Sequence, residues 1–154
     1  MRASEAMARK VCSVGPETTV AEAARIMCVS GHGSLPVLDA DGRFLGVVSK
    51  YDLVRHCLPG YLEEVGDLYR SGEFQPFLEK AKELAGAPVA GIMDTRAVVG
   101  SEDMPLAEVA SLMVTRHVHQ IPVLRQGKLL GVIGLQDVIS KLAEIAFCST
   151  STEP

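Results

Sequence analysis

The chain has 154 residues, enough for one compact body with a sizeable core and too few for two large independent domains. Hydrophobic residues make up 47% of it and aromatic residues only 5%, so we expect an aliphatic core. The formal net charge of -4 argues against a nucleic-acid or an anionic-membrane surface, because both reward clustered Lys and Arg. No apolar run approaches the ~20 residues that span a bilayer, and residues 1–10 lack the apolar core of a signal peptide.

The cysteines are scattered without any CxxC spacing, at Cys12, Cys28, Cys57 and Cys148. This pattern favours free thiols in a reducing cytoplasm over a metal site or a disulfide. We therefore expect a soluble, cytoplasmic protein without a bound metal.

An internal repeat is the dominant feature of the sequence. A shift of 86 residues aligns the first part of the two copies, and a shift of 85 aligns the rest, because one turn is a residue shorter in the second copy. The aligned pairs include Met7 with Met93, Met27 with Met113, Pro36 with Pro122, Leu45 with Leu130, and Asp52 with Asp137. Two copies of one unit usually bury a shared face, so a site carried by the unit is expected in pairs where the copies meet.

The first copy predicts the order strand, helix, strand, strand, helix. Thr19 and Glu22 form a Thr-x-x-Glu capping box at the first helix start, and Gly31 provides the helix end. The predicted elements are a strand at 11–14, a helix from Thr19 to Gly31, strands at 35–38 and 44–48 around a hairpin turn, and a helix from Ser49.

The second copy predicts the same order. Met104 and Pro105 replace the two threonines before its first helix, and proline is compatible with a first helical turn because its missing N–H would be unpaired there. Its predicted elements are a strand at 97–99, a helix at 105–115, strands at 121–124 and 129–133 around a turn, and a helix at 136–146.

Residues 55–87 have no counterpart after the second copy. They predict two short helices, at 61–69 and 77–84, with a solvated acidic face. Much of the chain's aromatic content is here, and it forms either a small satellite core or a contact surface for a partner. The residues concerned are Tyr61, Leu68, Tyr69, Phe74 and Phe77.

The repeated motif resembles the CBS motif, the cystathionine-β-synthase domain. It reads Leu-Pro-Val-Leu-Asp, turn, Leu-Gly-Val-Val-Ser-Lys-Tyr-Asp at 35–52, and its second copy ends at Asp137. The resemblance covers about 6–54 and 92–140 and implies a Bateman module, an α/β (α+β) fold of two β-α-β-β-α motifs packed with pseudo-two-fold symmetry. The implied domains are motif 1 at 1–56, a helical insertion at 57–88, motif 2 at 89–148 and a flexible tail at 149–154.

The resemblance also implies a function. Clefts between such motifs bind adenosine-containing ligands, namely AMP, ADP, ATP or S-adenosylmethionine, and modules form homodimers through their helices. No catalytic motif is visible, so we expect a regulatory ligand-sensing module. Because the chain starts at Met1 and shows no enzyme domain, we expect it to signal in trans to a separate effector protein. The alternative is a structural dimerisation module with empty or degenerate clefts.

Two sites follow from carrying the family's motif onto this chain. Site A would place Val98 and Val47 on adenine, Asp52 on ribose, and Lys50 and His119 near phosphate. Its residues are Val47, Ser49, Lys50, Asp52, Met93, Val98, His119 and Gln120. Site B is less complete and comprises Met7, Cys12, Gly33, Ser34, Val132 and Asp137.

The role of Asp52 has two interpretations. Ser49 and Asp52 can cap a helix, or the Asp52 carboxylate can accept from both ribose hydroxyls, and both roles are compatible. Gly134 replaces the serine in the second copy while Asp137 remains, which favours the ribose role.

The basic residues before the second pre-proline strand are likewise open to two interpretations. Arg116, His117 and His119 form either a solvated helix end or a phosphate contact, and zinc binding lacks a companion Cys or carboxylate motif. Gln120 and Ser34 stand where strong phosphate binders in the family carry a basic residue, which favours AMP or a nucleoside over polyphosphates.

Overall fold

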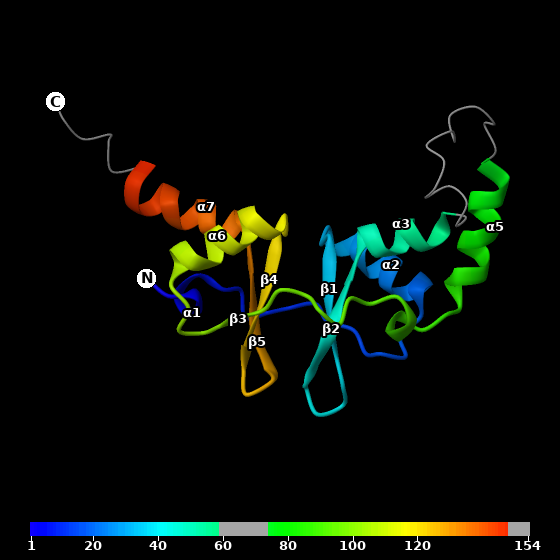
Figure 1. The fold of residues 1–154 in the computed structure, drawn as a ribbon, viewed down its shortest axis with the longest axis horizontal. Coiled ribbons are helices and arrows are strands. Elements are labelled where there is room, and N and C mark those ends of the chain that lie inside the picture. Colours follow the sequence, from blue (N-terminus) through cyan, green and yellow to red (C-terminus); the bar gives the residue numbers. More distant parts are fainter. Residues whose placement is uncertain (59–73, 148–154) are drawn as a thin grey trace. The chain divides into compact units, whose positions relative to one another are not determined.

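The computed structural model describes residues 1–58 and 74–147 (Figure 1). The chain forms two compact units that do not coincide with the two sequence repeats. Unit 1 comprises Met1–Cys12, Gly42–Phe44 and Arg96–Pro154, and unit 2 comprises Ser13–Asp41 and Leu45–Thr95. Each unit has its own aliphatic core.

Unit 2 is a small sheet covered by helices. The elements in chain order are α2 (Val20–Ser30), β1 (Ser34–Leu38), β2 (Phe44–Ser49), α3 (Lys50–Cys57), α5 (Phe74–Ala85) and the 3₁₀ turn η2 (Val89–Gly91). β1 and β2 form a two-stranded sheet. The predicted strand at 11–14 is reduced to a parallel bridge between Val14 and Val37. The core consists of Val14, Val20, Ala23, Met27, Leu35, Val37, Val48, Val89 and Ile92.

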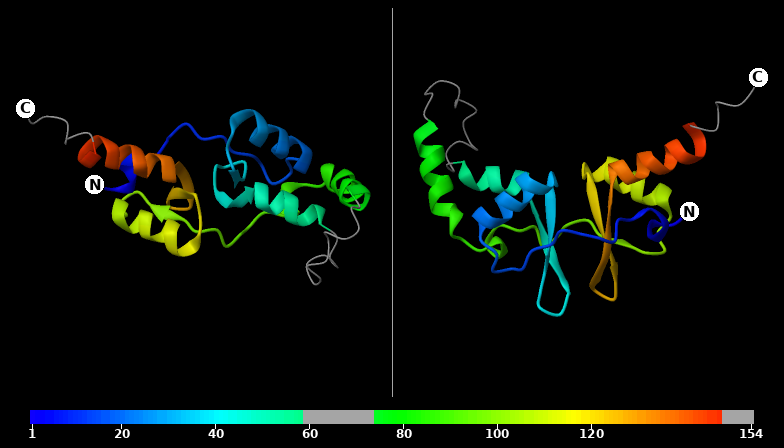
Figure 2. Two further views of the ribbon diagram at one scale, coloured as in Figure 1. Left: turned by 90° about the horizontal axis from the view of Figure 1, so that it is seen from above. Right: turned by 180° about the vertical axis from the view of Figure 1, so that it is seen from behind.

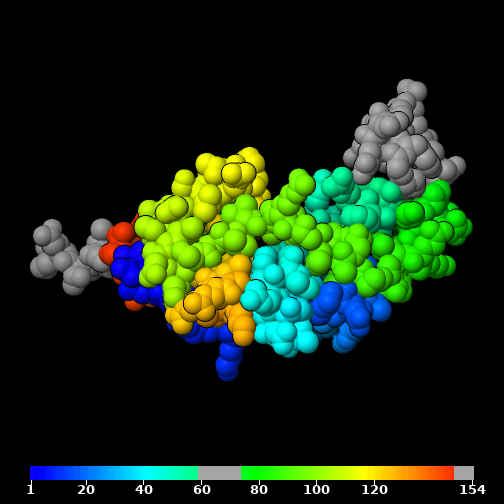
Figure 3. Space-filling model, turned by 60° about the horizontal axis from the view of Figure 1, so that its bottom comes forward, coloured from blue at the N-terminus to red at the C-terminus, as the bar shows by residue number. Residues whose placement is uncertain are grey.

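Unit 1 has the same plan with a longer ladder. Its elements are α1 (Ala3–Ala6), β3 (Gly100–Ser101), α6 (Leu106–Arg116), β4 (Gln120–Arg125), β5 (Lys128–Gly134), α7 (Leu135–Leu142) and the π-helical turn η3 (Ala143–Phe147). β3 pairs parallel to β4, and β4 pairs antiparallel to β5. The core consists of Ala3, Met7, Leu106, Val109, Met113, Ile121, Val123, Ile133 and Val138. Figure 2 shows the helices of this unit from two further directions, and Figure 3 shows the exposed turn after β4 in orange.

The two repeats therefore fold as the predicted mixed α/β elements, with one strand misplaced. The strand predicted at 97–99 lies at Gly100–Ser101, because the residue that pairs with Val123 is Gly100. This is the position that corresponds to Val14 in the first repeat.

Helix ends follow local chemistry. The Thr19 Oγ1 atom accepts from the Glu22 amide at 3.2 Å, and Gly31 ends α2 with φ 74°. The predicted capping box is only half present: among the described residues, the Glu22 carboxylate accepts no hydrogen bond from a backbone amide. Pro105 lies at the N-cap of α6 and provides no side-chain bond.

The residues at the start of each repeat, before its first strand, form a leading segment that packs on the elements of the other repeat. Residues 1–12 belong to unit 1, where the Ala3 amide donates to Met104 O at 2.8 Å. In unit 2 the corresponding bond runs from the Val89 amide to Thr18 O, also at 2.8 Å. The motif boundaries at 56, 88 and 148 stay a prediction.

The insertion contributes α5, which confirms the second of its two predicted helices. α5 packs against α3 and α2 in unit 2. The Phe74 and Phe77 rings lie 5.8 Å apart, and Phe74 is exposed. The helix predicted at 61–69, the residues Tyr61, Leu68 and Tyr69, and the tail at 149–154 lie outside the described residues.

Two further expectations concern the bulk properties. None of the helices within residues 1–58 and 74–147 combines the length and the apolar character that a bilayer crossing requires. Cys12, Cys28 and Cys57 are free thiols, and burial raises the pKa of Cys57. Cys148 lies outside the described residues.

Candidate functional site

The start of α3 in unit 2 holds the serine and aspartate of the repeated motif. The Asp52 Oδ2 atom accepts from the Ser49 amide and from the Ser49 hydroxyl, both at 2.8 Å. In return, the Ser49 Oγ atom accepts from the Asp52 amide at 3.2 Å. The two residues therefore form the predicted helix cap. Within the described part of the chain, the second carboxylate oxygen, Oδ1, has no hydrogen-bond donor.

The start of α7 in unit 1 corrects one step of the sequence argument. The sequence argument treated Asp137 as an aspartate without its capping partner, because Gly134 offers no side-chain cap. Its Oδ2 atom nevertheless accepts from the Gly134 amide at 2.7 Å. Capping at this end needs the carboxylate and a backbone amide, not the serine. The retention of Asp137 is therefore no argument for a ribose role.

In each unit, the strand before the aspartate-capped helix pairs with a segment from the start of the other repeat. In unit 2 the Val47 amide donates to Asp94 O at 3.0 Å and the Asp94 amide donates to Val47 O at 2.8 Å. In unit 1 Val132 makes the equivalent pair with Ala8, at 2.9 and 3.0 Å. Two residues proposed to contact a ligand, Val47 and Val132, are thus held in place by backbone pairing.

This pairing depends on glycine at the preceding strand position. A Cβ atom on Gly46 would lie 2.6 Å from Asp94 O, and one on Gly131 would lie 2.5 Å from Ala8 O. The sulfur atoms of Met93 and Met7 lie just beyond, at 3.4 and 3.0 Å from those two Cβ positions. Sequence reasoning missed the role of these two glycines, although the repeated Leu-Gly-Val signals it.

The residues before each pre-proline strand lie beside the helix start of the same unit. The Lys50 amide donates to Gly33 O at 2.9 Å in unit 2, and the Leu135 amide donates to His119 O at 3.0 Å in unit 1. The side chains of Lys50 and His119 are exposed. Both are therefore accessible to a dissolved anion.

The structure brings together part of each predicted site. Unit 2 holds the site A residues Val47, Ser49, Lys50, Asp52 and Met93 and the site B residues Gly33 and Ser34. Unit 1 holds the site A residues Val98, His119 and Gln120 and the site B residues Met7, Cys12, Val132 and Asp137. Met7 is a core residue, and Val98 and Cys12 each lie two residues before a sheet-paired position, at Gly100 and Val14.

The basic run after α6 is a helix end. Arg116 lies in the last turn of α6, and His117 closes the helix in the left-handed conformation with φ 53°. Arg116, His117 and His119 are all exposed. Among the described residues, no group of three or more His, Cys, Asp and Glu side chains is arranged to hold a metal.

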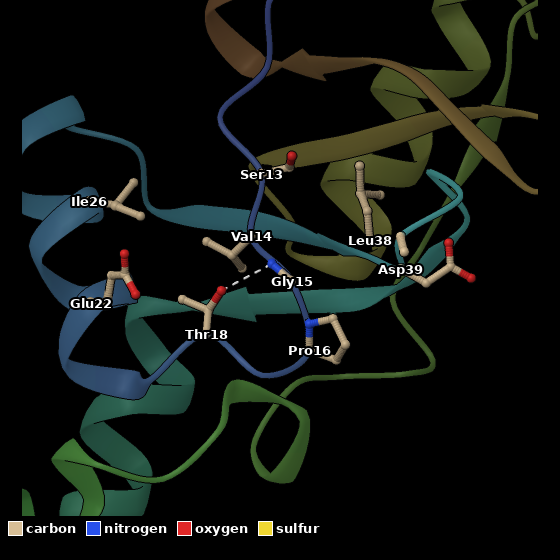
Figure 4. Close-up of a pocket in the computed structure, with 10 residues that line it drawn as sticks. Ser13, Val14, Gly15, Pro16, Thr18, Glu22, Ile26, Leu38 and Asp39 are labelled. Atoms are coloured by element: carbon tan, nitrogen blue, oxygen red, sulfur yellow. Dashed lines mark hydrogen bonds between the residues drawn. The ribbon is translucent and has the colours of Figure 1, made fainter.

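A depression of about 460 Å³ lies in unit 2 (Figure 4). The start of α3, which holds Ser49 and Asp52, is not part of its lining. At its edge the Gly15 amide donates to Thr18 Oγ1 at 3.1 Å. None of the predicted site residues lines it; the lining is Ser13, Val14, Gly15, Pro16, Thr18, Glu22, Ile26, Leu38, Asp39 and Ala40.

The second repeat carries an ion pair at the corresponding positions. Glu102 and Arg125 stand where the first repeat has Pro16 and Asp39. The Arg125 Nε atom donates to Glu102 Oε1 at 2.6 Å, and Nη2 bonds the other carboxylate oxygen. The hydrogen bond from Arg125 lowers the pKa of Glu102.

The duplicated strand–helix unit, with a Ser/Gly-x-x-Asp cap after each hairpin, defines a protein of paired CBS motifs. The CBS domain family matches residues 3–59 and 89–144. The chain belongs to this family.

Relatives and solved structures agree with this assignment. The CBS domain-containing protein YhcV of Bacillus subtilis is 26% identical over 135 residues, covering 87% of this chain and 80% of YhcV. The structure of CBSX2 in complex with AMP has a TM-score of 0.71 at 23% identity, covering 92% of this chain and 96% of that one. Protein MJ1225 of Methanocaldococcus jannaschii, a proposed archaeal homolog of γ-AMPK, has a TM-score of 0.77 at 21% identity, with 92% and 48% coverage.

Proposed function

We propose that this protein is a regulatory module that binds an adenosine-containing ligand and signals its presence to an effector protein in trans. Nucleotide sensing is the general role that the family and its neighbours support. AMP is bound in the structure of CBSX2, which shares the fold. The absence of catalytic motifs from the sequence supports a regulatory protein rather than an enzyme.

The observation that carries the proposal is that only one of the two oxygen atoms of the Asp52 carboxylate takes part in the helix cap. Oδ2 takes both bonds of the helix cap. Oδ1 has no donor among the described residues, so it is able to accept from a ribose hydroxyl without breaking the cap. Capping keeps the carboxylate ordered before the ligand arrives, which lowers the entropic cost of binding.

Charge in each unit supports an anionic ligand. The ammonium group of Lys50, on the first residue of α3, and the imidazole of His119 are exposed in their respective units. Gln120 and Ser34 add no charge beside them. We therefore propose AMP as the preferred ligand over ADP, ATP and S-adenosylmethionine. Site A comprises the eight residues assigned to it above, and site B is the weaker site.

Thermal unfolding with each of the four ligands tests the proposal. A ligand present at about 100 times its dissociation constant raises the free energy of unfolding by about 2.7 kcal/mol. We expect the largest rise in transition temperature with AMP. Absence of any rise with all four ligands would contradict the proposal.

Matched variants separate binding from capping. Asp52→Ala removes both the cap and the proposed ribose contact, whereas Asp137→Ala removes the equivalent cap at the weaker site. Each lost cap costs about 1 kcal/mol without ligand. We expect only Asp52→Ala to abolish the AMP-dependent rise, and Ser49→Gly, which copies Gly134 and keeps the Asp52 carboxylate, to weaken it without abolishing it.

A second candidate function is a structural dimerisation module with empty clefts. The observation that favours it is the cap at Asp137, since both aspartates have a structural role that requires no ligand. Under this alternative none of the four ligands changes the transition temperature, while self-association persists. Both candidates include a homodimer formed through the helices, and we place the protein in the cytoplasm.

A further inference from the structure

The two repeats build the same backbone turn before their first helix and place different side chains on it. In unit 2 the Thr18 amide donates to Gly15 O at 3.2 Å. In unit 1 the Met104 amide donates to Ser101 O at 3.1 Å. In both units the residue before the turn pairs in parallel with the next strand, β1 or β4. Because the backbones match, side chains one repeat apart can be compared directly.

In unit 1 a guanidinium group lies against this turn. Arg125, the last residue of β4, donates through Nε to Glu102 Oε1 at 2.6 Å. The Met104 side chain packs against the core of the unit. The Arg125 side chain is itself exposed, so it reaches the turn from the surface. The second repeat therefore supplies both the carboxylate and the cation of this pair.

In unit 2 the corresponding side chains are shorter and the cation is missing. Asp39 stands where unit 1 has Arg125. Pro16 stands where unit 1 has Glu102, and Thr18 stands where it has a methionine. The depression of about 460 Å³ lies at these three residues. Sites for small ligands measure about 300–1,000 Å³, so one long side chain fits.

The lining of the depression combines apolar side chains with two carboxylates, those of Glu22 and Asp39. Figure 4 shows these two residues on opposite sides of Thr18. The Glu22 carboxylate takes part in no hydrogen bond or ion pair with any described residue. Asp39 Oδ1 accepts from the Asp41 amide at 2.9 Å, and a carboxylate has further acceptor sites. None of the lining residues is cationic; the apolar ones are Val14, Pro16, Ile26, Leu38 and Ala40.

The charges around the depression are mixed. The two adjoining turns each add an exposed carboxylate, on Glu17 and Asp41. Two cations are close in sequence, Arg25 on α2 and Arg43, which is a member of unit 1. At roughly 100° per residue, Arg25 lies beyond the lining glutamate on the side away from Ile26, the other α2 residue of the lining. The depression therefore presents carboxylates, and the cation of α2 lies outside it.

We infer that this depression binds an arginine side chain of a partner protein. The inference rests on the proposed function and names a surface for its effector. An arginine buries its methylene groups along apolar side chains, and its planar guanidinium bonds carboxylates. In unit 1 the chain's own arginine satisfies the turn in this way. Ser13, Glu22 and Ala40 are exposed, so a side chain can enter from solvent while its backbone stays at the surface.

Nuclear magnetic resonance titration of the full ¹⁵N-labelled chain tests the inference. The probes are N-acetyl-arginine amide and N-acetyl-citrulline amide, which have nearly the same shape and differ in charge. We expect a saturable change in the amide signals of Gly15 and Thr18 with the arginine amide and none with the citrulline amide. Asp39→Asn is expected to weaken binding at least about fivefold, and Asp41→Asn, the control in the same turn, less than about twofold.

A double variant tests the comparison between the repeats. Pro16→Glu with Asp39→Arg copies the ion pair of unit 1 into unit 2, and we expect it to abolish the saturable change. Circular dichroism checks that all variants are folded. Equal changes with both probes, or binding that survives Asp39→Asn or the double variant, overturns the inference.

A peptide distinguishes a protein partner from a free guanidinium compound. Arginine flanked by two glycines on each side is expected to bind at least as tightly as the arginine amide. Loss of binding in this peptide overturns the assignment to a partner protein. The thermal shift with AMP is measured separately and does not depend on Asp39, so each of these failures leaves the ligand-sensing proposal intact.

Discussion

The amide of Leu106, the first residue of α6, donates to the carbonyl oxygen of Met1 at 3.1 Å. The first amide of α2, on Val20, is bound in the same way by Ala87 O at 2.9 Å. The two acceptors are 86 residues apart, like the two donors. Each repeat therefore starts its first helix with a carbonyl from the other repeat's leading segment, which satisfies an amide that no residue of the helix itself can pair.

The first prediction concerns Met7, which lies in the leading segment of the first repeat and is buried in the core of unit 1. Met7→Ala is expected to lower the free energy of unfolding by about 2–4 kcal/mol, because it leaves a cavity against Gly131. Urea denaturation measures the loss.

Met93→Ala is the matched control, since Met93 occupies the equivalent position but is only half-buried. We expect a loss of less than about 2 kcal/mol. Equal losses in the two variants would show that burial does not distinguish the two leading segments.

The second prediction concerns the close backbone approach at Gly46. Gly46→Ala places a methyl group 2.6 Å from Asp94 O and forces the Val47–Asp94 pair apart. We expect a loss of at least about 2 kcal/mol in the free energy of unfolding, measured by urea denaturation. Gly91→Ala is the control, because no heavy atom lies within 4 Å of its Cβ position. A Gly46→Ala protein as stable as this control would refute the steric argument.

The third prediction concerns acid stability. Arg125 lowers the pKa of Glu102 in the folded chain, so the folded state binds this proton less readily than the unfolded state does. The resulting stabilisation is complete above the unfolded pKa of about 4.3 and disappears as the pH falls through the lower folded pKa.

Urea denaturation of Glu102→Gln over a range of pH measures this contribution. We expect the variant to be less stable than the wild type at neutral pH and equal to it in acid. The control is Glu17→Gln, whose exposed side chain lies in unit 2. A difference from the wild type that is constant with pH would show that the ion pair does not couple to protonation.

The fourth prediction concerns His117, which ends α6 with φ 53°. The first repeat has Gly31 at this position, with φ 74°. A left-handed conformation is costly for a side chain with a Cβ atom, so His117→Gly is expected to raise the free energy of unfolding by about 0.5–1 kcal/mol. Thermal unfolding measures the gain, and Gly31→Ala is expected to change stability in the opposite direction. A destabilised His117→Gly would mean that the imidazole makes a contribution larger than the strain.

Much of the fold was predictable because its signals are local. The Thr19 cap, the terminating Gly31 and the apolar spacing in between mark α2 within a dozen residues. The hairpins and the repeat period are equally visible in the chain. The strand at Gly100 was misplaced because it is only two residues long and is defined by its partner, Val123, rather than by its own side chains.

The candidate site was predictable only in part. The Ser49–Asp52 cap follows from adjacent residues, and the structure confirms it. The cap at Asp137 was missed because a backbone amide supplies the donor, and every residue type except proline has one. Whether Asp52 binds ribose remains a prediction.

The sequence by itself determined the elements, their duplication and the family, because capping, periodicity and turns depend on residues close together in the chain. Only the tertiary structure decided that residues 1–12 pack with the second repeat and that Val47 pairs with Asp94. These contacts are backbone hydrogen bonds between segments far apart in the chain. Such bonds are specified by the packing of whole elements, and they leave no local pattern of side chains to read.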